Sequence, residues 1–295
     1  MTQINSNSWH PPLARFTAVI GQISLTSPTH VLEQIALAID NNQSSDLFVF
    51  PEYATCADSL KFSDLPYLND DPALLQAAQN WARCSAPCSE VFRLSEKFGK
   101  AVVFGCLDQV GAALKSRCYF HDPITKTTLH YDKTHVHWTE GFIQAGDEIS
   151  AFDTRFGRIG CLICFDMAFS EAARVVGVKG ADILCAISAV PKEFDWRYVH
   201  RRLAGAAINN QYYVLGAQLG YTPKAPMGGH SAAFAPDGAI IEHLDDTRSG
   251  TISVDICHDA IRAWRQQENM QPHRRPSLYA PLCAPLGAAS NQHHS

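Results

Sequence analysis

Residues 157–177 read GRIGCLICFDMAFSEAARVVG and change character at Cys164. The part up to Cys164 is an almost continuous apolar run with the length of a buried strand. The part after it has apolar residues at helical spacing, from about Ala168 to Val178. A buried strand that leads directly into a helix is the building unit of α/β proteins. This stretch therefore predicts the α/β class and places a cysteine at a strand-to-helix turn.

Strands and helices alternate over most of the remaining chain. The pattern predicts strands at 16–25, 46–51, 101–107, 182–189, 212–219 and 251–256, and helices at 28–39, 72–98 and 194–210. Two more strand pairs are joined by short turns, Asp122-Pro123 within 117–131 and Pro236-Asp237-Gly238 within 231–243. Parallel units combined with hairpins predict mixed sheets rather than purely parallel ones.

The length and composition fit one large globular domain. The chain has 295 residues, of which 46% are hydrophobic, and single α/β domains of about 250 residues are common. No linker-like stretch divides the sequence. We therefore expect a single domain at 15–280, preceded by an extension at 1–14 and followed by a tail at 281–295.

The charge pattern argues against several classes of partner. The formal net charge is 24 − 29 = −5 and no dense basic block is present, so we expect neither nucleic-acid nor membrane binding. Apolar runs such as Ile159–Phe165 are far shorter than the ~20 residues of a membrane span. The first residues lack the basic start and apolar stretch of a secretory signal, so a soluble, cytoplasmic protein is expected.

The ten cysteines are expected to be mostly reduced and structural. A chain without a secretory signal that is large enough to build its own core does not need disulfides. Cys106, Cys161 and Cys185 lie inside apolar runs, where free cysteine packs as a small hydrophobe. Cys161 and Cys164 form a C-x-x-C, but positions i and i+3 of one strand point to opposite faces. We therefore do not expect these two to pair.

Three segments carry residue types that could perform chemistry. In FVFPEYAT, 48–55, Glu52 ends a buried strand, where partial burial would raise its pKa and suit it to act as a general base. A lysine held in a pocket, such as Lys133, can stabilise negative charge on an oxygen. Cys164 would meet backbone N–H groups and the positive end of a helix dipole, which favour thiolate. Each residue alone also fits an ordinary role, as a solvated carboxylate or a buried cysteine.

Two histidines follow Lys133 in YDKTHVHWTEGFIQAGDE, 131–148. His135 and His137 could form half of a metal site, because alternate residues of a strand share a face. No cysteine or carboxylate joins them at a convincing ligand spacing. We therefore expect hydrogen-bonding histidines and no metal. A zinc or redox protein built on ten Cys and thirteen His stays open as an alternative.

The order of the three segments is informative. Glu52 in FPE, Lys133 in DKTH and Cys164 in CFDMAFSE each follow a predicted strand, at separations of 81 and 31 residues. This series resembles the nitrilase superfamily of carbon–nitrogen hydrolases. The resemblance covers about residues 15–280 and extends to FDWRYVHRRLAGAAINNQYYVLGAQLG (194–220), GHSAAFAPDGAIIEHL (229–244) and RRPSLY (274–279). It implies a four-layer α-β-β-α sandwich.

The resemblance also implies a Glu–Lys–Cys triad. Cys164 would attack the carbon of an amide or nitrile, and Glu52 would take the thiol proton and later activate water. Lys133 and the backbone N–H of Phe165 would hold the oxyanion. No metal or organic cofactor is required. The family likeness suggests a homodimer or a larger homo-oligomer, with 274–281 as a candidate contact.

Other residues match the family less directly. Glu140, seven residues after Lys133, resembles a second glutamate that orients substrate and supports the general base in the family's amidases. Asp166 and Glu171 resemble positions that hold loops, and Ser170 stands where the family usually has proline. Aromatic side chains are candidate walls of the substrate pocket, namely Trp138, Phe142, Trp196 and Tyr221.

The expected reaction is hydrolysis of a small carboxamide to a carboxylic acid and ammonia. Phe165-Asp166 after the cysteine differs from the Trp-Glu of true nitrilases, which favours an amidase. An N-carbamoyl amine hydrolase is the nearest alternative, because EAAR at 171–174 is similar to that branch, although its longer lysine-to-glutamate insert is missing. A nitrilase and a catalytically silent scaffold of the same fold are further alternatives.

Overall fold

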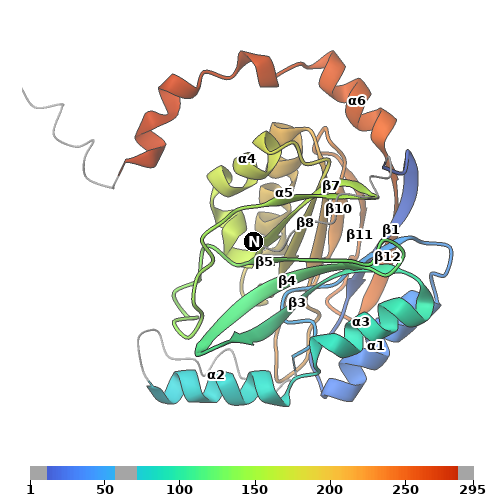
Figure 1. The fold of residues 1–295 in the computed structure, drawn as a ribbon, viewed down its shortest axis with the longest axis vertical. Coiled ribbons are helices and arrows are strands. Elements are labelled where there is room, and N and C mark those ends of the chain that lie inside the picture. Colours follow the sequence, from blue (N-terminus) through green and yellow to red (C-terminus); the bar gives the residue numbers. More distant parts are fainter. Residues whose placement is uncertain (1–11, 57–71, 285–295) are drawn as a thin grey trace, which may run out of the picture.

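A computed structural model describes residues 12–56 and 72–284. These residues form two six-stranded sheets that lie face to face, with helices on the outer sides (Figure 1). Most of the expected extension at 1–14 and of the expected tail at 281–295 lies outside the described residues. The single domain expected at 15–280 stays a prediction.

Both sheets are mixed, as the sequence predicts. The first sheet consists of β1 (Arg15–Gln22), β2 (Leu47–Val49), β3 (Ala101–Val110), β4 (Ala113–Asp122), β5 (Thr127–Asp132) and β12 (Gly250–Cys257). The second consists of β6 (Ala151–Thr154), β7 (Gly157–Ile163), β8 (Ile183–Ser188), β9 (Tyr213–Gln218), β10 (Ala232–Phe234) and β11 (Ile240–His243). Their orders are β12-β1-β2-β3-β4-β5 and β11-β10-β9-β8-β7-β6. In each sheet three parallel strands, β1-β2-β3 or β7-β8-β9, are flanked by antiparallel ones.

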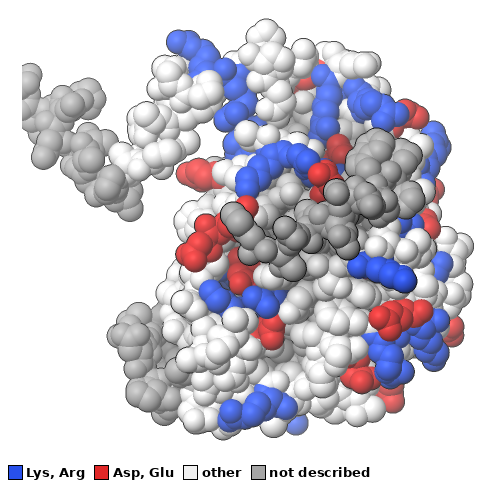
Figure 2. All heavy atoms as spheres, in the orientation of Figure 1, with Lys and Arg blue, Asp and Glu red and all other residues white. Residues whose placement is uncertain are grey.

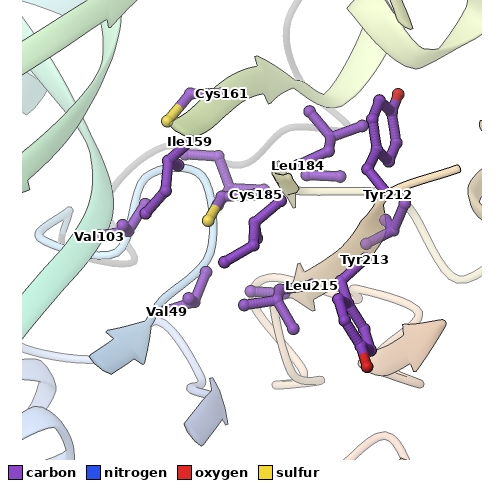
Figure 3. Close-up of a cluster of buried hydrophobic side chains, with 14 of the residues drawn as sticks. Val49, Val103, Ile159, Cys161, Leu184, Cys185, Tyr212, Tyr213 and Leu215 are labelled. Carbon is purple, nitrogen blue, oxygen red and sulfur yellow. The ribbon is translucent and has the colours of Figure 1, made fainter. Parts of the chain in front are cut away.

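An apolar core fills the space between the sheets. Successive residues of a strand point to opposite faces, so Ala101 and Val103 of β3 enter this core while Val102 and Phe104 point to the helices outside. Figure 3 shows side chains of β2 and β3 beside those of β7, β8 and β9. Every residue of β8 is buried, because helices also cover the outer face of the second sheet.

Helices complete the four layers of the expected α-β-β-α sandwich. The first sheet is covered by α1 (Pro28–Asp40) and α3 (Cys88–Phe98), and the second by α4 (Ser170–Val178) and α5 (Trp196–Asn210). α4 approaches β7 closely because Gly160 has no side chain: a Cβ there would lie 2.3 Å from Cγ1 of Val176. Further helical segments are α2 (Pro72–Cys84), α6 (His258–Gln267), and the 3-10 turns η2 (Cys164–Ala168), η3 (Gln271–His273) and η4 (Pro276–Cys283).

The surface has two features that bear on partners. Acidic and basic side chains are interspersed over the face shown in Figure 2. The segment from α6 to η4 runs as an arc away from the sandwich (Figure 1). Among the described helices, none combines the length and the apolar character needed to cross a membrane.

The structure differs from the sequence prediction in two elements. The helix expected at 72–98 is two helices, because Pro87 lacks an N–H and disfavours helical geometry at the residue before it. The helix α6 is not predicted at all. Its composition is strongly polar and its buried residues are His258 and Ile261, so the sequence there resembles the polar tail that follows.

Substitution by alanine should change the free energy of unfolding in opposite directions at two glycines. Gly205 lies in α5 and a Cβ there would meet nothing within 4 Å, so Gly205→Ala should raise the free energy of unfolding by ~0.5–1 kcal/mol. At Gly105 of β3 a Cβ would lie 2.6 Å from Cα of Glu52, so Gly105→Ala should lower that free energy by ~1–3 kcal/mol. Urea unfolding followed by circular dichroism measures both. Similar shifts in the two variants would contradict the close contact between β3 and Glu52.

Candidate active site

Strand ends from both sheets meet at one place. In the first sheet Glu52 follows β2 and Lys133 follows β5, and in the second Cys164 follows β7 and Ala189 follows β8. The backbone N–H of Ala189 donates to Oε2 of Glu52 at 3.0 Å and so joins the two sheets here. The structure therefore brings together residues that lie far apart in the sequence.

Lys133 lies between two carboxylates. Its Nζ donates a hydrogen bond of 2.8 Å to Oε1 of Glu52 and another of 2.8 Å to Oε2 of Glu140. All three residues are buried, with exposed fractions of 1% for Lys133 and Glu52 and 5% for Glu140. Burial opposes the charged form, but the two carboxylates raise the pKa of Lys133 well above its ordinary value. Lys133 is therefore an ammonium.

Glu52 is the carboxyl group of this cluster that titrates near neutral pH. Burial raises its pKa to about 7, because the opposing effect of Lys133 is partly cancelled by the negative charge of Glu140. Its Oε1 also accepts from the hydroxyl of Ser116 at 3.4 Å. A carboxyl group held through both oxygens and with this pKa can accept and return a proton at physiological pH.

Glu140 behaves in the opposite way. Burial alone would raise its pKa, but Lys133, the hydroxyl of Tyr53 and the N–H of His137 lower it below the ordinary value. Tyr53 donates to Oε1 at 2.5 Å and the N–H of His137 donates to Oε2 at 3.1 Å. The two environments thus separate a glutamate that is ionised at neutral pH, Glu140, from one that titrates there, Glu52.

Cys164 stands at a strained bend. β7 ends at Ile163, and Cys164 opens the 3-10 turn η2. Its φ is +47°, a left-handed conformation that non-glycine residues rarely adopt and that is concentrated at functional sites. Tyr53, directly after Glu52, has a φ of +57°. A left-handed backbone conformation therefore occurs in both turns of the site, at Cys164 after β7 and at Tyr53 next to Glu52.

The expectation that Cys164 favours thiolate is wrong for the resting site. Burial and the negative charge of Glu52 raise its pKa above the ordinary value, and Lys133 offsets this in part. The α-helix whose dipole was expected to act begins only at Ser170, because the first turn after the strand is a 3-10 turn. A neutral thiol has to transfer its proton before it can act as a nucleophile.

Asp166 connects the cysteine turn to the loop after β5. Its carboxylate is fully buried and accepts from the N–H groups of Ile163 at 2.9 Å and of His135 at 2.8 Å. The hydroxyls of Tyr131 and Thr134 donate to it at 2.8 and 3.0 Å. Although burial would raise the pKa of Asp166, these bonds and the His135 side chain hold it below the ordinary value. Asp166 therefore positions both segments, the role that its family resemblance implies.

A row of aromatic rings borders the cysteine turn. The rings of Trp138 and Phe165 lie 5.5 Å apart edge to face, and those of Phe165 and Phe169 lie 5.3 Å apart. His137 packs on Trp138 at 3.8 Å, and His135 stacks on Phe169 at 4.1 Å. Trp138 is 49% exposed, so the row reaches the surface.

The remaining sequence-predicted residues lie in varied surroundings. Phe142 is buried in the core beneath the helices of the first sheet. Trp196 stacks on His230 at 4.8 Å, and Tyr221 lies under the ammonium group of Lys192 at 4.9 Å. The structure therefore gives Phe142, Trp196 and Tyr221 partners outside the row of rings that borders the cysteine turn.

The two histidines considered as a metal pair have separate partners. Nδ1 of His135 lies 2.9 Å from Oδ1 of Asp166, and Nδ1 of His137 lies 2.7 Å from the hydroxyl of Thr139. Hydrogen bonding therefore accounts for one ring nitrogen of each.

Sequence reasoning missed three groups that hold the site. Tyr53 is adjacent to Glu52, and this position beside a candidate base is a signal that could have found it. Ser116 lies 64 residues from Glu52, and Ala189 lies 137 residues away and acts through its backbone. A contact between residues so far apart in the sequence gives no local sequence signal. A backbone N–H gives none either, because every residue except proline has one.

Comparison with known proteins supports one family. The sequence pattern of the carbon–nitrogen hydrolase family matches residues 17–266. A probable nitrilase of Schizosaccharomyces pombe is 33% identical over 159 residues, which cover 52% of this chain and 58% of that protein. An omega-amidase of Xenopus laevis is 31% identical over 142 residues, which cover 46% of this chain and 50% of that protein. The chain thus spans about half the length of these curated relatives.

Solved structures share the fold. The crystal structure of Saccharomyces cerevisiae Nit3, a member of branch 10 of the nitrilase superfamily, superposes with a TM-score of 0.72 at 20% identity. The superposition covers 91% of this chain and 100% of that one. The α/β class and the sandwich of two mixed sheets, expected from the sequence, are confirmed.

Asp166→Asn should test the link between the cysteine turn and the loop after β5. The amide keeps the volume but loses the charge and half of the acceptor capacity, so the free energy of unfolding should fall by ~2–4 kcal/mol. Asp153→Asn is the matched control, because Asp153 pairs with Arg158 at the surface and should contribute less than ~1 kcal/mol. Urea unfolding of the two variants gives the comparison. An Asp166→Asn protein as stable as the Asp153→Asn protein would contradict the positioning role.

Proposed function

The chain belongs to the carbon–nitrogen hydrolase family, and we propose that it hydrolyses a small carboxamide to a carboxylic acid and ammonia. The observation that carries this proposal is the position of Lys133, which binds both a titrating and an ionised carboxyl group. The thiol of Cys164 lies close enough to affect the pKa of Glu52. A thiol, a base and a cation in one site are the groups that covalent acyl transfer requires.

In the first half of the proposed reaction, Cys164 passes its thiol proton to Glu52 and its sulfur attacks the amide carbon. A base with a pKa of about 7 is ionised near neutral pH and still binds the proton that it receives. Negative charge moves to the carbonyl oxygen, where Nζ of Lys133 and the backbone N–H of Phe165 stabilise it.

In the second half, the tetrahedral intermediate collapses and its carbon–nitrogen bond breaks. Glu52 gives its proton to the departing nitrogen, ammonia leaves, and the acyl group stays on Cys164. Glu52, again a carboxylate, then takes a proton from water, whose oxygen attacks the acyl carbon. The carbon–sulfur bond breaks, the carboxylic acid leaves, and the proton returns from Glu52 to Cys164.

Glu140 keeps the site in the charge state that these steps need. In each half of the proposed reaction Glu52 holds a proton for a time. While it does, Lys133 has one negatively charged partner instead of two. Glu140 remains ionised, because its pKa lies below the ordinary value, and it holds Lys133 as an ammonium. The cation is therefore available to the oxyanion when the negative charge forms.

An N-carbamoyl amine hydrolase is the second candidate. The residues that resemble that branch, Glu171 and Arg174, lie in the first turns of α4, directly after the cysteine turn. The same triad would then attack a ureido carbon.

We also propose that the chain works as a homodimer or larger homo-oligomer. The supporting observation is the exposure of Leu278, Tyr279 and Leu282 in η4, which lies on the arc that leaves the sandwich (Figure 1). These residues overlap the contact at 274–281 that the family likeness suggests.

Ammonia release from a substrate panel separates the candidate reactions. Small carboxamides should release ammonia readily, and the matching nitriles should release little or none. Cys164→Ala should abolish turnover, whereas Cys161→Ala, which alters a buried cysteine of β7, should retain it. Turnover of nitriles at an equal or faster rate would remove the protein from the amidase branch. An active Cys164→Ala variant would remove the nucleophile assignment.

The raised pKa of Glu52 predicts opposite effects of pH on activity and on stability. The value of kcat/KM for a carboxamide should rise with pH through about 7, as Glu52 becomes the carboxylate that accepts the thiol proton. Because the pKa in the folded state lies above the ordinary 4.5, protonated Glu52 favours folding, and this contribution is lost as the pH rises through about 7.

Glu52→Gln cannot titrate, so it should gain stability relative to the wild type as the pH rises from about 5 to about 8. Urea unfolding at several pH values measures the difference. A difference that does not change with pH would show that the pKa of Glu52 is not raised.

A further inference from the structure

Three cysteines form a cluster behind the turn that carries Glu52. Cys106 lies on β3, Cys88 is the first residue of α3, and Cys56 closes the turn after Glu52, with its N–H donating to the carbonyl of Tyr53 at 2.8 Å. All three belong to or pack against the core beneath the helices of the first sheet. Cys56 and Cys106 are buried, whereas Cys88 is partly exposed, and all three thiols are free.

The packing of α3 on β3 places two of these thiols together. Two residues separate the end of α3 from the start of β3, so the helix and the strand run antiparallel. Phe92 of α3 packs edge to face on Phe104 of β3 at 5.6 Å. Cys88 lies one helical turn before Phe92, about 6 Å along the helix axis. Cys106 lies two residues after Phe104 on the same face of the strand, about 7 Å further along.

These nearly equal steps along helix and strand place Cys88 and Cys106 at the same level of the two packed elements. The thiol of Cys88 is accordingly the largest influence on the pKa of Cys106, which it raises together with burial. We propose that Cys88 and Cys106 are a redox pair that a hydroperoxide, such as hydrogen peroxide, converts to a disulfide. This site is separate from the Glu–Lys–Cys cluster and does not depend on the reaction proposed for it.

Cys88 reacts first because it is partly exposed, whereas Cys106 is buried. Its thiolate attacks one oxygen of hydrogen peroxide and the O–O bond breaks, which leaves a sulfenic acid on Cys88 and releases the other oxygen as water with the thiol proton. Cys106 then gives up its proton and its sulfur attacks the sulfur of Cys88. The S–O bond breaks and a second water leaves. Two electrons pass from the two thiols to the peroxide.

A disulfide at this place acts on Glu52. Its sulfurs are ~2.05 Å apart, closer than two thiols in contact, so the first turn of α3 moves towards β3. Ala86, just before α3, donates its N–H to the carbonyl of Thr55 in the Glu52 turn at 2.8 Å. Gly105, the neighbour of Cys106, packs directly on the backbone of Glu52. Oxidation therefore displaces Glu52 and lowers activity, a consequence that rests on the proposed function.

A second thiol cluster provides an internal comparison. Cys118, Cys161 and Cys185 also lie together, in the core between the two sheets. Each of them is at most 1% exposed. An oxidant cannot reach these thiols in the folded protein, so they should stay reduced under conditions that oxidise Cys88 and Cys106.

Disulfide mapping by mass spectrometry tests the pair without reference to activity. A Cys164→Ala protein is treated with hydrogen peroxide, alkylated and digested, so that oxidation at Cys164 does not interfere. One peptide pair that joins Cys88 to Cys106, and that dithiothreitol separates, is the expected result. Cys88→Ser should abolish this pair, while Cys84→Ser, which alters an exposed thiol at the end of α2, should retain it.

Alkylation of both Cys88 and Cys106 after peroxide treatment would overturn the proposal, and so would a disulfide to Cys56 or to any other cysteine. The circular dichroism of Cys88→Ser should match that of the parent, because the residue is partly exposed and the hydroxyl fits the same space. If that variant is misfolded, mapping of the parent protein alone still decides the matter.

The coupling to Glu52 is tested in the protein that retains Cys164. Peroxide followed by dithiothreitol should first lower and then restore kcat, by up to ~10²-fold, the scale of a misplacement of about 1 Å. Cys88→Ser should lose less activity than Cys84→Ser. Equal losses in the two variants would overturn the coupling. A mapped disulfide in a protein whose reduced form releases no ammonia would count against the amidase proposal alone.

Discussion

A buried ammonium shared by two carboxylates is the interaction on which the site depends. Lys133 could not be buried without a negative partner, and neither glutamate could be ionised there without the lysine. One carboxylate would suffice to neutralise the ammonium. Burial, together with the negative charge of the second carboxylate, raises the pKa of Glu52 to about 7 against the opposing effect of Lys133, while Glu140 stays ionised. The titrating carboxyl group of the site is thus set by burial and by a second carboxylate that shares the same cation.

The backbone around this cluster is held in conformations that it would not adopt alone. Cys164 and Tyr53 both have left-handed φ values, +47° and +57°, each of which costs ~1–3 kcal/mol. Asp166 offsets the cost on the cysteine side with its bonds to Ile163 and to the loop after β5. On the other side the hydroxyl of Tyr53 binds Glu140. The hydrogen bonds that set the charges therefore also fix the strained turns.

The end of a strand can be recognised from the residues around it. For that reason the layers of the fold and the charged residues of the site could be predicted from the sequence. Glu52 and Cys164 each follow a short apolar run, and such runs are the strands of the central sheets. The aromatic surroundings could not be predicted in full. Trp138 and Phe142 both flank Glu140 in the sequence, and only tertiary packing decides that Trp138 contacts Phe165 while Phe142 enters the core. The protonation state of the Cys164 thiol could not be predicted from the sequence either, because it depends on desolvation and on where the next helix begins.

Each sheet supplies only half of the site. The first carries Glu52 and Lys133, the second carries Cys164 and Ala189, and the chain crosses between the sheets at 133–150 and at 244–249. Under the proposed function, turnover requires that the two separately hydrogen-bonded layers stay docked. A slight separation of the layers would move Glu52 and Lys133 away from Cys164 while every strand kept its partners. Loss of activity would then report separation of the two layers, and loss of secondary structure would report unfolding of the sheets themselves.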